Sequence, residues 1–336
     1  MQLRTLLEKL IADKSLSVDE MKEIMHGCLQ NTIDPIQLAA FLALMRMKGE
    51  TVEELTVAAQ VMLEHAHCIN LGNDLIDIVG TGGDAHNTIN ISTASSIVAA
   101  AAGISIAKHG SGAFSSKSGS MDFLQMLGIS LTNDKHHLQQ SLQIANICFL
   151  SAPLFHTGLQ YIRPIRKQLG IRTFFNLLGP LLNPARVKKQ IVGVCNAALM
   201  QPLAEVLVHL GSQRFFIVHA RDGLDEISIA DYTDVLEFDQ GHYHAWTIDP
   251  KAFDLFHPNL QDIIIDSPQQ SIDKIMDVFA GKPGACRDII LLNSGAAIFL
   301  GGGANTLQSA IHYAAEAIDS GRVQQCVNNL QQLSRS

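Results

Sequence analysis

The chain has 336 residues, of which 47% are hydrophobic and 17% are charged, and its formal net charge is -8. This length suggests about two domains, and the apolar content excludes a disordered protein, which has few hydrophobic residues and a high net charge. The acidic balance argues against a protein that coats nucleic acid or an anionic membrane.

The first 70 residues predict a small all-helical domain. Ser17 and Thr51 each begin a capping-box pattern with a glutamate three residues later, and each precedes apolar residues at helical spacing. Between them, residues 36–47 predict an apolar-rich helix. Its apolar stripe, which requires a partner surface, consists of Leu38, Phe41, Leu42 and Met45.

The pattern changes at residues 75–79, a β-branched run that ends in a glycine turn and predicts a buried strand. Further strands are predicted over residues 104–107, 147–150, 191–195 and 215–219. Helices are predicted between and after them, over residues 91–102, 120–127, 135–144, 200–210, 269–280, 287–300 and 304–317. Such alternation implies an α/β fold with a mostly parallel central sheet.

We therefore expect a helical domain over residues 1–70 and a larger α/β domain over residues 71–336. The proline-punctuated region from about 155 to 185 would supply helices that return to the helical domain. A ligand is expected at the carboxyl ends of the strands, in the crevice between the domains.

A glycine-rich segment follows the first predicted strand. Residues 80–84 read Gly-Thr-Gly-Gly-Asp, and residues 87–93, rich in amides and hydroxyls, lead into the next helix. Glycines let backbone N–H groups approach an anion closely, and the positive end of the helix adds to the attraction. The segment lacks the Gly-Lys-Ser/Thr of a Walker loop. A plain glycine turn before a capped helix is the alternative.

A second loop of the same character follows the next strand. Residues 108–120 contain two lysines, one histidine, five serines and three glycines. Lysines supply charge and hydroxyls supply hydrogen-bond geometry, a combination that suits a polyphosphate. The alternative is a solvated Ser/Gly linker, but two such loops at successive strand ends favour a ligand site.

Two weaker clusters come later in the chain. Arg166 and Arg172 lie in a basic segment near His156 that could clamp a carboxylate, although a solvated basic helix face is the favoured interpretation of this segment taken alone. Asp225 and Glu226 follow the strand that ends near residue 219, and adjacent carboxylates suit Mg²⁺ bound partly through water and phosphate. A plain acidic turn is the alternative there.

The six cysteines are scattered and form no C-x-x-C pair, which argues against a zinc knuckle and is typical of reduced cytosolic thiols. Residues 1–14 are charged and lack the apolar core of a signal peptide. The longest apolar run, residues 97–103, is far shorter than the roughly 20 residues that span a bilayer. We expect a soluble, cytoplasmic protein that binds neither membrane nor nucleic acid.

Together these segments resemble the anthranilate phosphoribosyltransferases, a family of the nucleoside-phosphorylase-like phosphoribosyltransferase class. The resemblance covers nearly the whole chain and also includes residues 175–184, 222–228 and 287–293, in the same order. It implies a homodimer formed through the helical domain. It also implies transfer of phosphoribose from 5-phosphoribosyl 1-diphosphate (PRPP) to the amine of anthranilate, with Mg²⁺, two ions in each site, and release of pyrophosphate.

The resemblance also implies the site residues. Catalytic roles fall to Lys108, His109 and Arg166. Ligands of Mg²⁺ would be Ser92, Asp225 and Glu226. Anthranilate would contact Gly80, Ser111, His156, Arg166 and Pro180. PRPP would contact Gly80, Gly83, Asp84, Thr88, Asn90, Ile91, Ser92, Thr93, Lys108, His109, Gly110, Ser111, Gly112, Ala113, Phe114, Ser115, Ser116 and Ser120.

The chain departs from the family pattern beside the acceptor. The family reads Lys-His-Gly-Asn-Arg where this chain has Ser111 and Gly112 in the last two places, and its His-Pro is His156-Thr157 here. Serine in place of asparagine shortens a side chain that donates a hydrogen bond, and glycine in place of arginine removes a fixed charge. A hydrogen bond to a charged group contributes roughly 1.5–3 kcal/mol of binding free energy. The other residues expected at PRPP and Mg²⁺ match the family pattern. A paralogous phosphoribosyltransferase with a different aromatic acceptor therefore stays open as the alternative.

Overall fold

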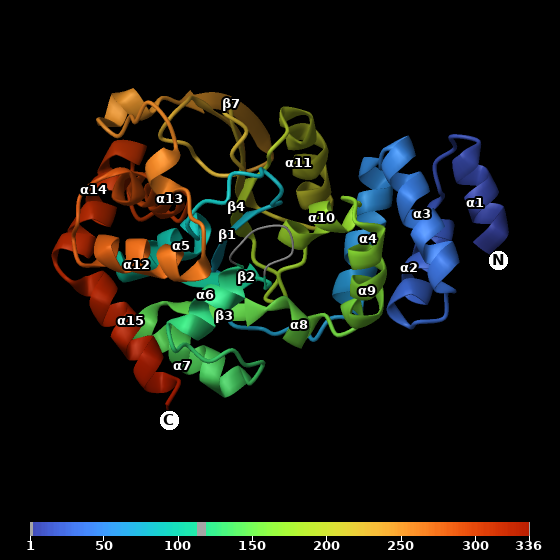
Figure 1. Ribbon diagram of the computed structural model, residues 1–336, viewed down its shortest axis with the longest axis horizontal. Helices are drawn as coiled ribbons and strands as arrows, with labels where there is room; N and C mark the ends of the chain where they lie inside the picture. Colours follow the sequence, from blue (N-terminus) through green and yellow to red (C-terminus); the bar gives the residue numbers. More distant parts are fainter. Residues whose placement is uncertain (1–2, 113–118, 336) are drawn as a thin grey trace.

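The computed structural model describes residues 3–112 and 119–335, and it places a helical body beside an α/β body (Figure 1). The helical body begins with α1 (Leu3–Ile11), α2 (Val18–Leu29), α3 (Pro35–Lys48) and α4 (Val52–Glu64). Both predicted capping boxes are present, and the side chains of Ser17 and Thr51 accept backbone N–H groups of α2 and α4. The predicted apolar stripe of α3 is buried as expected.

After the third strand the chain returns to this helical body. α9 (Leu159–Leu169) packs against α2 and α3, and α10 (Phe175–Leu178) contacts α4. α9 ends at Leu169, and the next residue, Gly170, has a φ of +68° that turns the chain back toward the sheet. The segment after α9 therefore connects the helical body to the carboxyl ends of the central strands.

Within the described residues, one sheet of seven strands forms the centre of the α/β body, in the order β3-β2-β1-β4-β5-β6-β7. Its parallel strands are β1 (Ile76–Gly80), β2 (Ile106–Gly110), β3 (Ile147–Ser151), β4 (Lys189–Gly193) and β5 (Arg214–Ala220). The chain visits β2 and β3 on one side of β1 and then β4 and β5 on the other. Such a switch point leaves a crevice at the carboxyl ends of β1 and β4.

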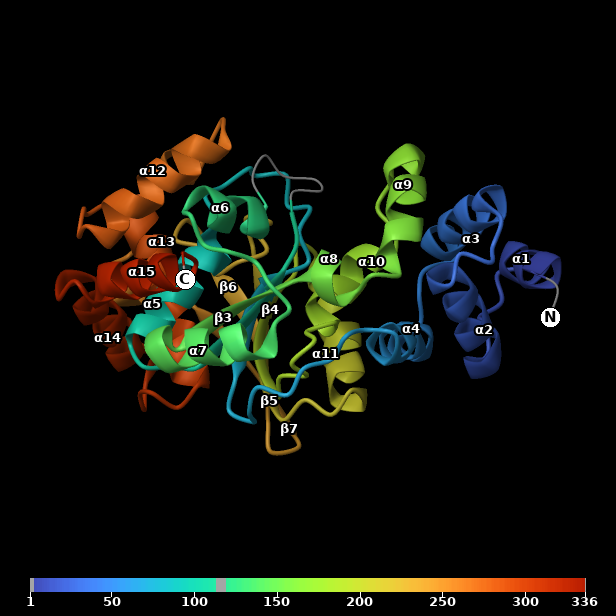
Figure 2. The same cartoon turned by 90° about the horizontal axis from the view of Figure 1, so that it is seen from below.

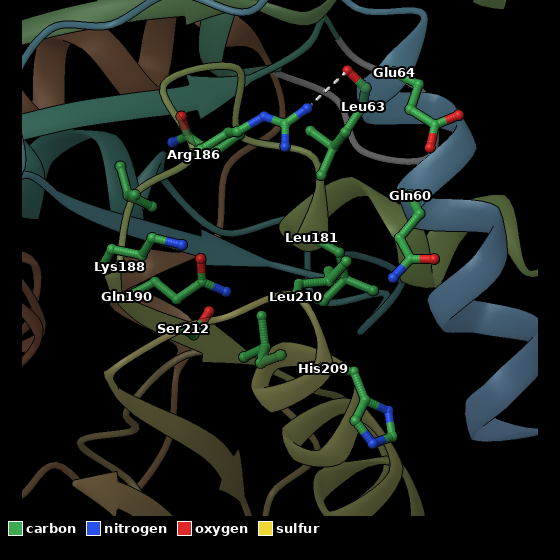
Figure 3. A pocket seen from close by; sticks show the side chains of 13 residues that line it. Gln60, Leu63, Glu64, Leu181, Arg186, Lys188, Gln190, His209, Leu210 and Ser212 are labelled. Atoms are coloured by element: carbon green, nitrogen blue, oxygen red, sulfur yellow. Dashed lines mark hydrogen bonds between the residues drawn. The ribbon is translucent and has the colours of Figure 1, made fainter. Parts of the chain in front are cut away.

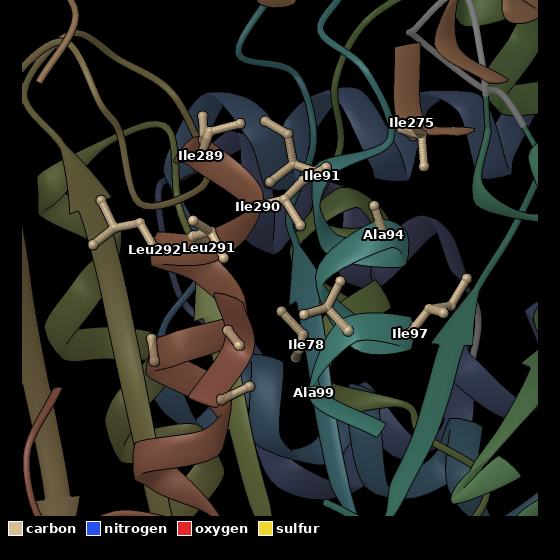
Figure 4. Close-up of a cluster of buried hydrophobic side chains, with 14 of the residues drawn as sticks. Ile78, Ile91, Ala94, Ile97, Ala99, Ile275, Ile289, Ile290, Leu291 and Leu292 are labelled. Carbon is tan, nitrogen blue, oxygen red and sulfur yellow. The ribbon is translucent and has the colours of Figure 1, made fainter. Parts of the chain in front are cut away.

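Helices cover both faces of the sheet, as Figure 2 shows from the side. Their bounds are α5 (Ile91–Ala101), α6 (Ser120–Met126), α7 (Lys135–Ala145), α8 (Ala152–Phe155), α11 (Met200–His209), α12 (Pro268–Phe279), α13 (Ala285–Leu300), α14 (Leu307–Asp319) and α15 (Arg322–Leu333). Successive side chains of β5 enter different cores, because strand side chains alternate between faces. Phe216 joins the cluster under α5 and α13, part of which Figure 4 shows, whereas Phe215 joins the cluster shared with the helical body.

The expected mostly parallel α/β sheet with a helical N-terminal body is confirmed, but two features were not predicted. The antiparallel strands β6 (Thr233–Asp239) and β7 (His242–Ile248) extend the sheet beyond β5. β7 has no buried apolar run, because all but its last residue are exposed or half-buried, so its sequence carries little strand signal. α15 is rich in Gln and Asn and buries only a narrow stripe. No helix among the described residues could span a membrane.

Candidate active site

The glycine loop after β1 lies against the acidic segment after β5. The Gly82 N–H donates to Oδ2 of Asp225 at 2.6 Å. Gly82 and Gly83 have φ of +69° and +83°, values that favour glycine. A Cβ at Gly80 would overlap the Asp225 carboxylate. The glycines therefore provide both the turn and the space for this close approach.

The first turn of α5 binds the second carboxylate of that segment. Ser92 donates to Oε1 of Glu226 from its Oγ at 2.5 Å and from its backbone N–H at 3.2 Å. A helix N-terminus carries positive partial charge and favours such an anion. Asn90, the cap residue, instead exchanges hydrogen bonds with Ser271. The predicted metal residues Ser92, Asp225 and Glu226 are thus brought together from distant parts of the sequence.

These acidic groups are crowded in a buried place. Burial raises the pKa of Asp225 well above its usual range, and the charges of Asp84 and Glu226 raise it further. Burial also raises the pKa of Glu226 to about 7, against the opposing effects of Ser92 and Lys108. A divalent cation would relieve this repulsion. Since no three His, Cys, Asp or Glu residues of the described chain form a metal site by themselves, Mg²⁺ here would also need phosphate or water oxygens.

Lys108 and His109 lie near the end of β2 and are buried, at 3% and 4% exposure. Burial lowers the pKa of Lys108, while the charges of Asp77 and Glu226 favour its protonated form. Asp77 accepts one hydrogen bond from the backbone N–H of His109 at 3.2 Å and another from the side-chain amide of Asn183 at 2.8 Å. Asp77 and Asn183 were not singled out from the sequence, although an aspartate inside an apolar strand run is a signal that could have found the first of them.

His109 and His156 form a pair with ring centroids 5.5 Å apart. Burial lowers the pKa of both imidazoles, so both are neutral near pH 7. His156 Nε2 lies 2.8 Å from the Leu182 carbonyl oxygen and therefore donates to it, which leaves Nδ1 as an acceptor. Within the described ranges, His156 Nδ1 and His109 Nε2 have no hydrogen-bond partner. Gly179, which precedes Pro180, also contacts His109.

Arg166 projects from α9 toward α10. Its Nη2 donates to Asn176 Oδ1 at 3.2 Å, and its guanidinium carbon lies 5.4 Å from the centre of the Phe175 ring. Burial lowers its pKa to about 10, so the group stays charged at neutral pH. Arg166 is therefore a half-buried cation held by α10, rather than part of a solvated basic face.

Arg172 reaches the glycine loop, although the sequence places it only in a basic cluster. A Cβ at Gly83 would overlap its guanidinium, and its Nη1 lies 3.7 Å from Cys195 Sγ, just after β4. It follows Gly170, so its position depends on how the chain turns after α9. Its place beside Gly83 makes it a further cation of the candidate site.

The remaining residues expected at PRPP differ in their placement. Ser120 folds back on the end of β2, where its Oγ donates to the Ser111 carbonyl at 3.1 Å and leaves no room for a Cβ at Gly110. The Ile91 side chain belongs to the core and that of Thr93 is buried as well. The backbone of Thr88 pairs with Ile264. The other expected residues, Ala113, Phe114, Ser115 and Ser116, lie outside the described residues.

Two family models match the chain: a glycosyl transferase family α/β domain over residues 72–324, and the helical bundle domain of that family over residues 4–66. An anthranilate phosphoribosyltransferase of Legionella pneumophila (strain Paris) is 49% identical, over 100% of this chain and 98% of that protein. The chain belongs to the anthranilate phosphoribosyltransferase family.

Solved structures of the anthranilate phosphoribosyltransferase family share the fold. The enzyme of Thermus thermophilus has a TM-score of 0.90 and 31% identity, over 98% of this chain and 99% of that one. The enzyme of Saccharomyces cerevisiae, solved in complex with PRPP and Mg, has a TM-score of 0.89 and 29% identity, over 99% and 98%. These matches do not favour the alternative acceptor that Ser111 and Gly112 left open.

Proposed function

We propose that this chain transfers phosphoribose from PRPP to the amine of anthranilate, giving N-(5-phosphoribosyl)anthranilate and pyrophosphate, in the second step of tryptophan biosynthesis from chorismate. One observation supports this above others: the glycine loop, the start of α5, Lys108 and two carboxylates converge at the carboxyl edge of the sheet. Backbone donors and cations at this place suit a diphosphate sugar.

The reaction breaks the bond from C1 of the ribose to pyrophosphate and forms a bond from C1 to the amine nitrogen, which loses a proton. The burden on the enzyme is to neutralise the leaving group and to position the amine. Lys108 and the N–H groups of the glycine loop would act on the diphosphate. Gly83, Asp84 and the start of α5 would hold the rest of the donor, together with the loop that begins at Gly110.

Mg²⁺ fits the acidic part of this site. Asp225 and Glu226 are hard oxygen ligands whose repulsion a divalent cation relieves. We assign these two residues and Ser92 as protein ligands, and two ions to each site, with phosphate and water completing each shell. When bound, Mg²⁺ neutralises the charge of the departing pyrophosphate.

The acceptor would lie between Arg166 and the histidine pair. Arg166 would hold the anthranilate carboxylate, since a guanidinium fork matches that group. We infer that His109 Nε2 and His156 Nδ1, which have no hydrogen-bond partner within the described residues, accept an amine N–H. Gly80, Ser111 and Pro180 would complete the contacts with the acceptor.

A steady-state assay tests the reaction directly. The purified chain, PRPP, anthranilate and Mg²⁺ should yield pyrophosphate and consume the fluorescent anthranilate in equal amounts. Asp225→Asn combined with Glu226→Gln should nearly abolish this activity. Absence of product from the folded wild-type chain at high enzyme concentration would refute the proposal.

We also propose a homodimer formed through the helical body. Ile36 and Met47 on α3 are 81% and 73% exposed, and Ile11 on α1 is 60% exposed. Ile36 and Met47 are eleven positions apart, which places them on one face of the helix. Light scattering should give a dimer for the wild type and a monomer for Ile36→Glu with Met47→Glu. The matched variant Met126→Glu, on α6, should remain a dimer, and a monomeric wild type would contradict this assembly.

A reducing compartment fits the sulfur chemistry of the chain. All six cysteines lie in the described ranges and are free thiols. Burial raises the pKa of Cys28 to about 12, which leaves its thiol inert. We propose a cytoplasmic location, and cell fractionation that finds the protein outside the cytoplasm would exclude it.

A further inference from the structure

A cavity lies at the amino-terminal end of β4, whereas the candidate active site lies at the carboxyl ends of the strands. It has a volume of about 200 Å³ and lies between the C-terminal ends of α4 and α11 and the chain that leads into β4 (Figure 3). Lys188 and Gln190 line it at the start of β4, whereas the glycine loop meets the other end of that strand, beside Gly193. Its lining contains none of the residues assigned to PRPP or anthranilate, although Gln190 donates from Nε2 to the Pro180 carbonyl at 3.5 Å.

The cavity carries two cations without an acidic partner. Within the described chain, neither Arg186 nor Lys188 forms an ion pair with a carboxylate. Arg186 donates from Nη2 to the Leu63 carbonyl at 3.3 Å, at the end of α4. Lys188 approaches Gly211, at the end of α11. The negative end of α4 thus holds Arg186 by a hydrogen bond, and the negative end of α11 lies close to the Lys188 ammonium.

Polar and apolar groups divide the lining between them. In Figure 3 the Lys188 ammonium and the Gln190 amide point toward the middle, and Gln190 is only 3% exposed. Four leucine side chains supply most of the apolar lining: Leu63, Leu181, Leu207 and Leu210. The lining also includes the side chains of Val187, Gln60, His209 and Ser212. The one acidic side chain of the lining, Glu64, points away from the middle (Figure 3). A ligand with one negative charge and an apolar body would match the cationic and the apolar parts of this lining.

We propose that this cavity binds a small organic carboxylate with an apolar body, as an effector of the enzyme. Lys188 and Arg186 would hold the carboxylate, Gln190 would orient it, and the leucines would cover the apolar part. A phosphate ion, which is fully hydrated in water, would leave the leucine surface uncovered and is a poorer match.

The cavity is joined to the candidate active site by buried hydrogen bonds. Asn183, which lines the cavity, donates from Nδ2 to Asp77 Oδ2 and to the Ala107 carbonyl, both at 2.8 Å. Asp77 in turn accepts the backbone N–H of His109 at 3.2 Å. A ligand that shifts the segment around Asn183 therefore acts on the end of β2, which carries Lys108. Effector binding should change the affinity for PRPP, and PRPP should change effector affinity by the same factor.

Calorimetry with phenylacetate as the probe tests the binding site without turnover. We expect binding that is about tenfold to 100-fold weaker in Lys188→Gln, the loss typical of a charged hydrogen bond. Arg186→Gln is a second variant, and thermal unfolding without ligand checks that each folds. Lys22→Gln, an exposed control, and Arg166→Gln, which removes the carboxylate partner proposed for anthranilate, should bind normally.

The opposite results would overturn the assignment. Absence of binding, or binding lost in Arg166→Gln and kept in Lys188→Gln, would leave the cavity without this ligand. Equal binding of phenylacetamide would exclude recognition of the carboxylate, and equal binding of inorganic phosphate would exclude the role of the apolar body.

Only the coupling depends on the proposed function, because phenylacetate binding is measured without substrates. With the cavity saturated, the affinity for PRPP should change at least threefold. An unchanged affinity would remove the effector role and leave a binding site. If the wild-type chain binds phenylacetate normally but does not catalyse the proposed reaction, only the proposed reaction is contradicted.

Discussion

The backbone N–H of Gly82 donates to the Asp225 carboxylate across 143 positions of sequence, at 2.6 Å. This bond makes the glycine loop and the acidic turn one unit. One backbone N–H of the glycine loop donates to a proposed metal ligand. A structural change in the glycine loop should therefore shift the acidic turn, and the reverse.

A methyl group at position 80 should disrupt this unit. In Gly80→Ala, the new Cβ would overlap the Asp225 carboxylate and push the acidic turn away from the loop. We expect kcat/KM for PRPP to fall on the order of 100-fold, since misplacement of about 1 Å can cost that much. Gly128→Ala, at an exposed turn with φ of +75° and open space, should lose stability but keep activity. Normal kinetics in Gly80→Ala would show that the two segments move independently.

Neutralising the acidic pair should separate stability from activity. In metal-free buffer, Asp225→Asn with Glu226→Gln removes buried like charges, so the melting temperature should stay equal or rise. Turnover with Mg²⁺ should fall at least about 100-fold, because the leaving group loses its neutralising ions. Differential scanning calorimetry and steady-state kinetics measure both, with Asp231→Asn on the same loop as control. A lower melting temperature together with unchanged turnover would mean that the pair is structural.

Arg172 should matter for PRPP and Arg163 should not. Arg172→Gln removes a charge that lies against Gly83, whereas Arg163 is exposed on α9. Loss of a charged hydrogen bond, roughly 1.5–3 kcal/mol, corresponds to about tenfold to 100-fold in kcat/KM for PRPP. Initial-rate kinetics of Arg172→Gln and Arg163→Gln make a matched comparison. Equal rates in the two variants would reduce Arg172 to a packing role.

The buried histidines should make the fold sensitive to acid. Burial lowers the pKa of His109 and His156 in the folded state, whereas an unfolded histidine titrates near pH 6.5. Above pH 6.5 both states are neutral and the full stability is present. As the pH falls below 6.5, the unfolded state takes up protons and the free energy of unfolding decreases, by up to about 1.4 kcal/mol per pH unit for each histidine.

Denaturant midpoints between pH 5 and 8 measure this slope. His109→Gln should reduce it, because one of the two groups no longer titrates. The exposed His242→Gln is a control that should leave the slope unchanged. A slope that is identical in wild type and His109→Gln would show that His109 takes up its proton as readily in the folded chain as in the unfolded one.

The loop after β2 offers a test of acceptor binding. Gly112 lies beside Asp122, with its Cβ position 3.3 Å from the carboxylate, so an arginine there has an acidic neighbour. Ser111→Asn with Gly112→Arg restores the pair typical of the family and should raise kcat/KM for anthranilate by about tenfold to 100-fold. A decrease would mean that the loop of this chain is adapted to serine and glycine.

The sequence alone determined the elements whose signals are local. Capping boxes at Ser17 and Thr51, the stripe of α3 and the strand-helix alternation after residue 75 all follow from short-range periodicity, and the structure confirms them. The family is also fixed by sequence, because its motifs are contiguous segments in a given order. The roles of the individual site residues remain predictions, because the motifs indicate which residues form the site but not what each one binds.

Only the tertiary structure decided which distant groups meet. Asp77 gains its importance from its hydrogen bond to His109, Asn183 from its hydrogen bond to Asp77, and Arg172 from its place against Gly83. No local pattern encodes these contacts. β7 forms because β6 offers an edge to pair with, and its exposed side chains give no periodic signal of their own. The physical reason is the same in each case: local conformation depends on neighbours in sequence, whereas buried hydrogen bonds, close approaches and edge pairing depend on neighbours in space.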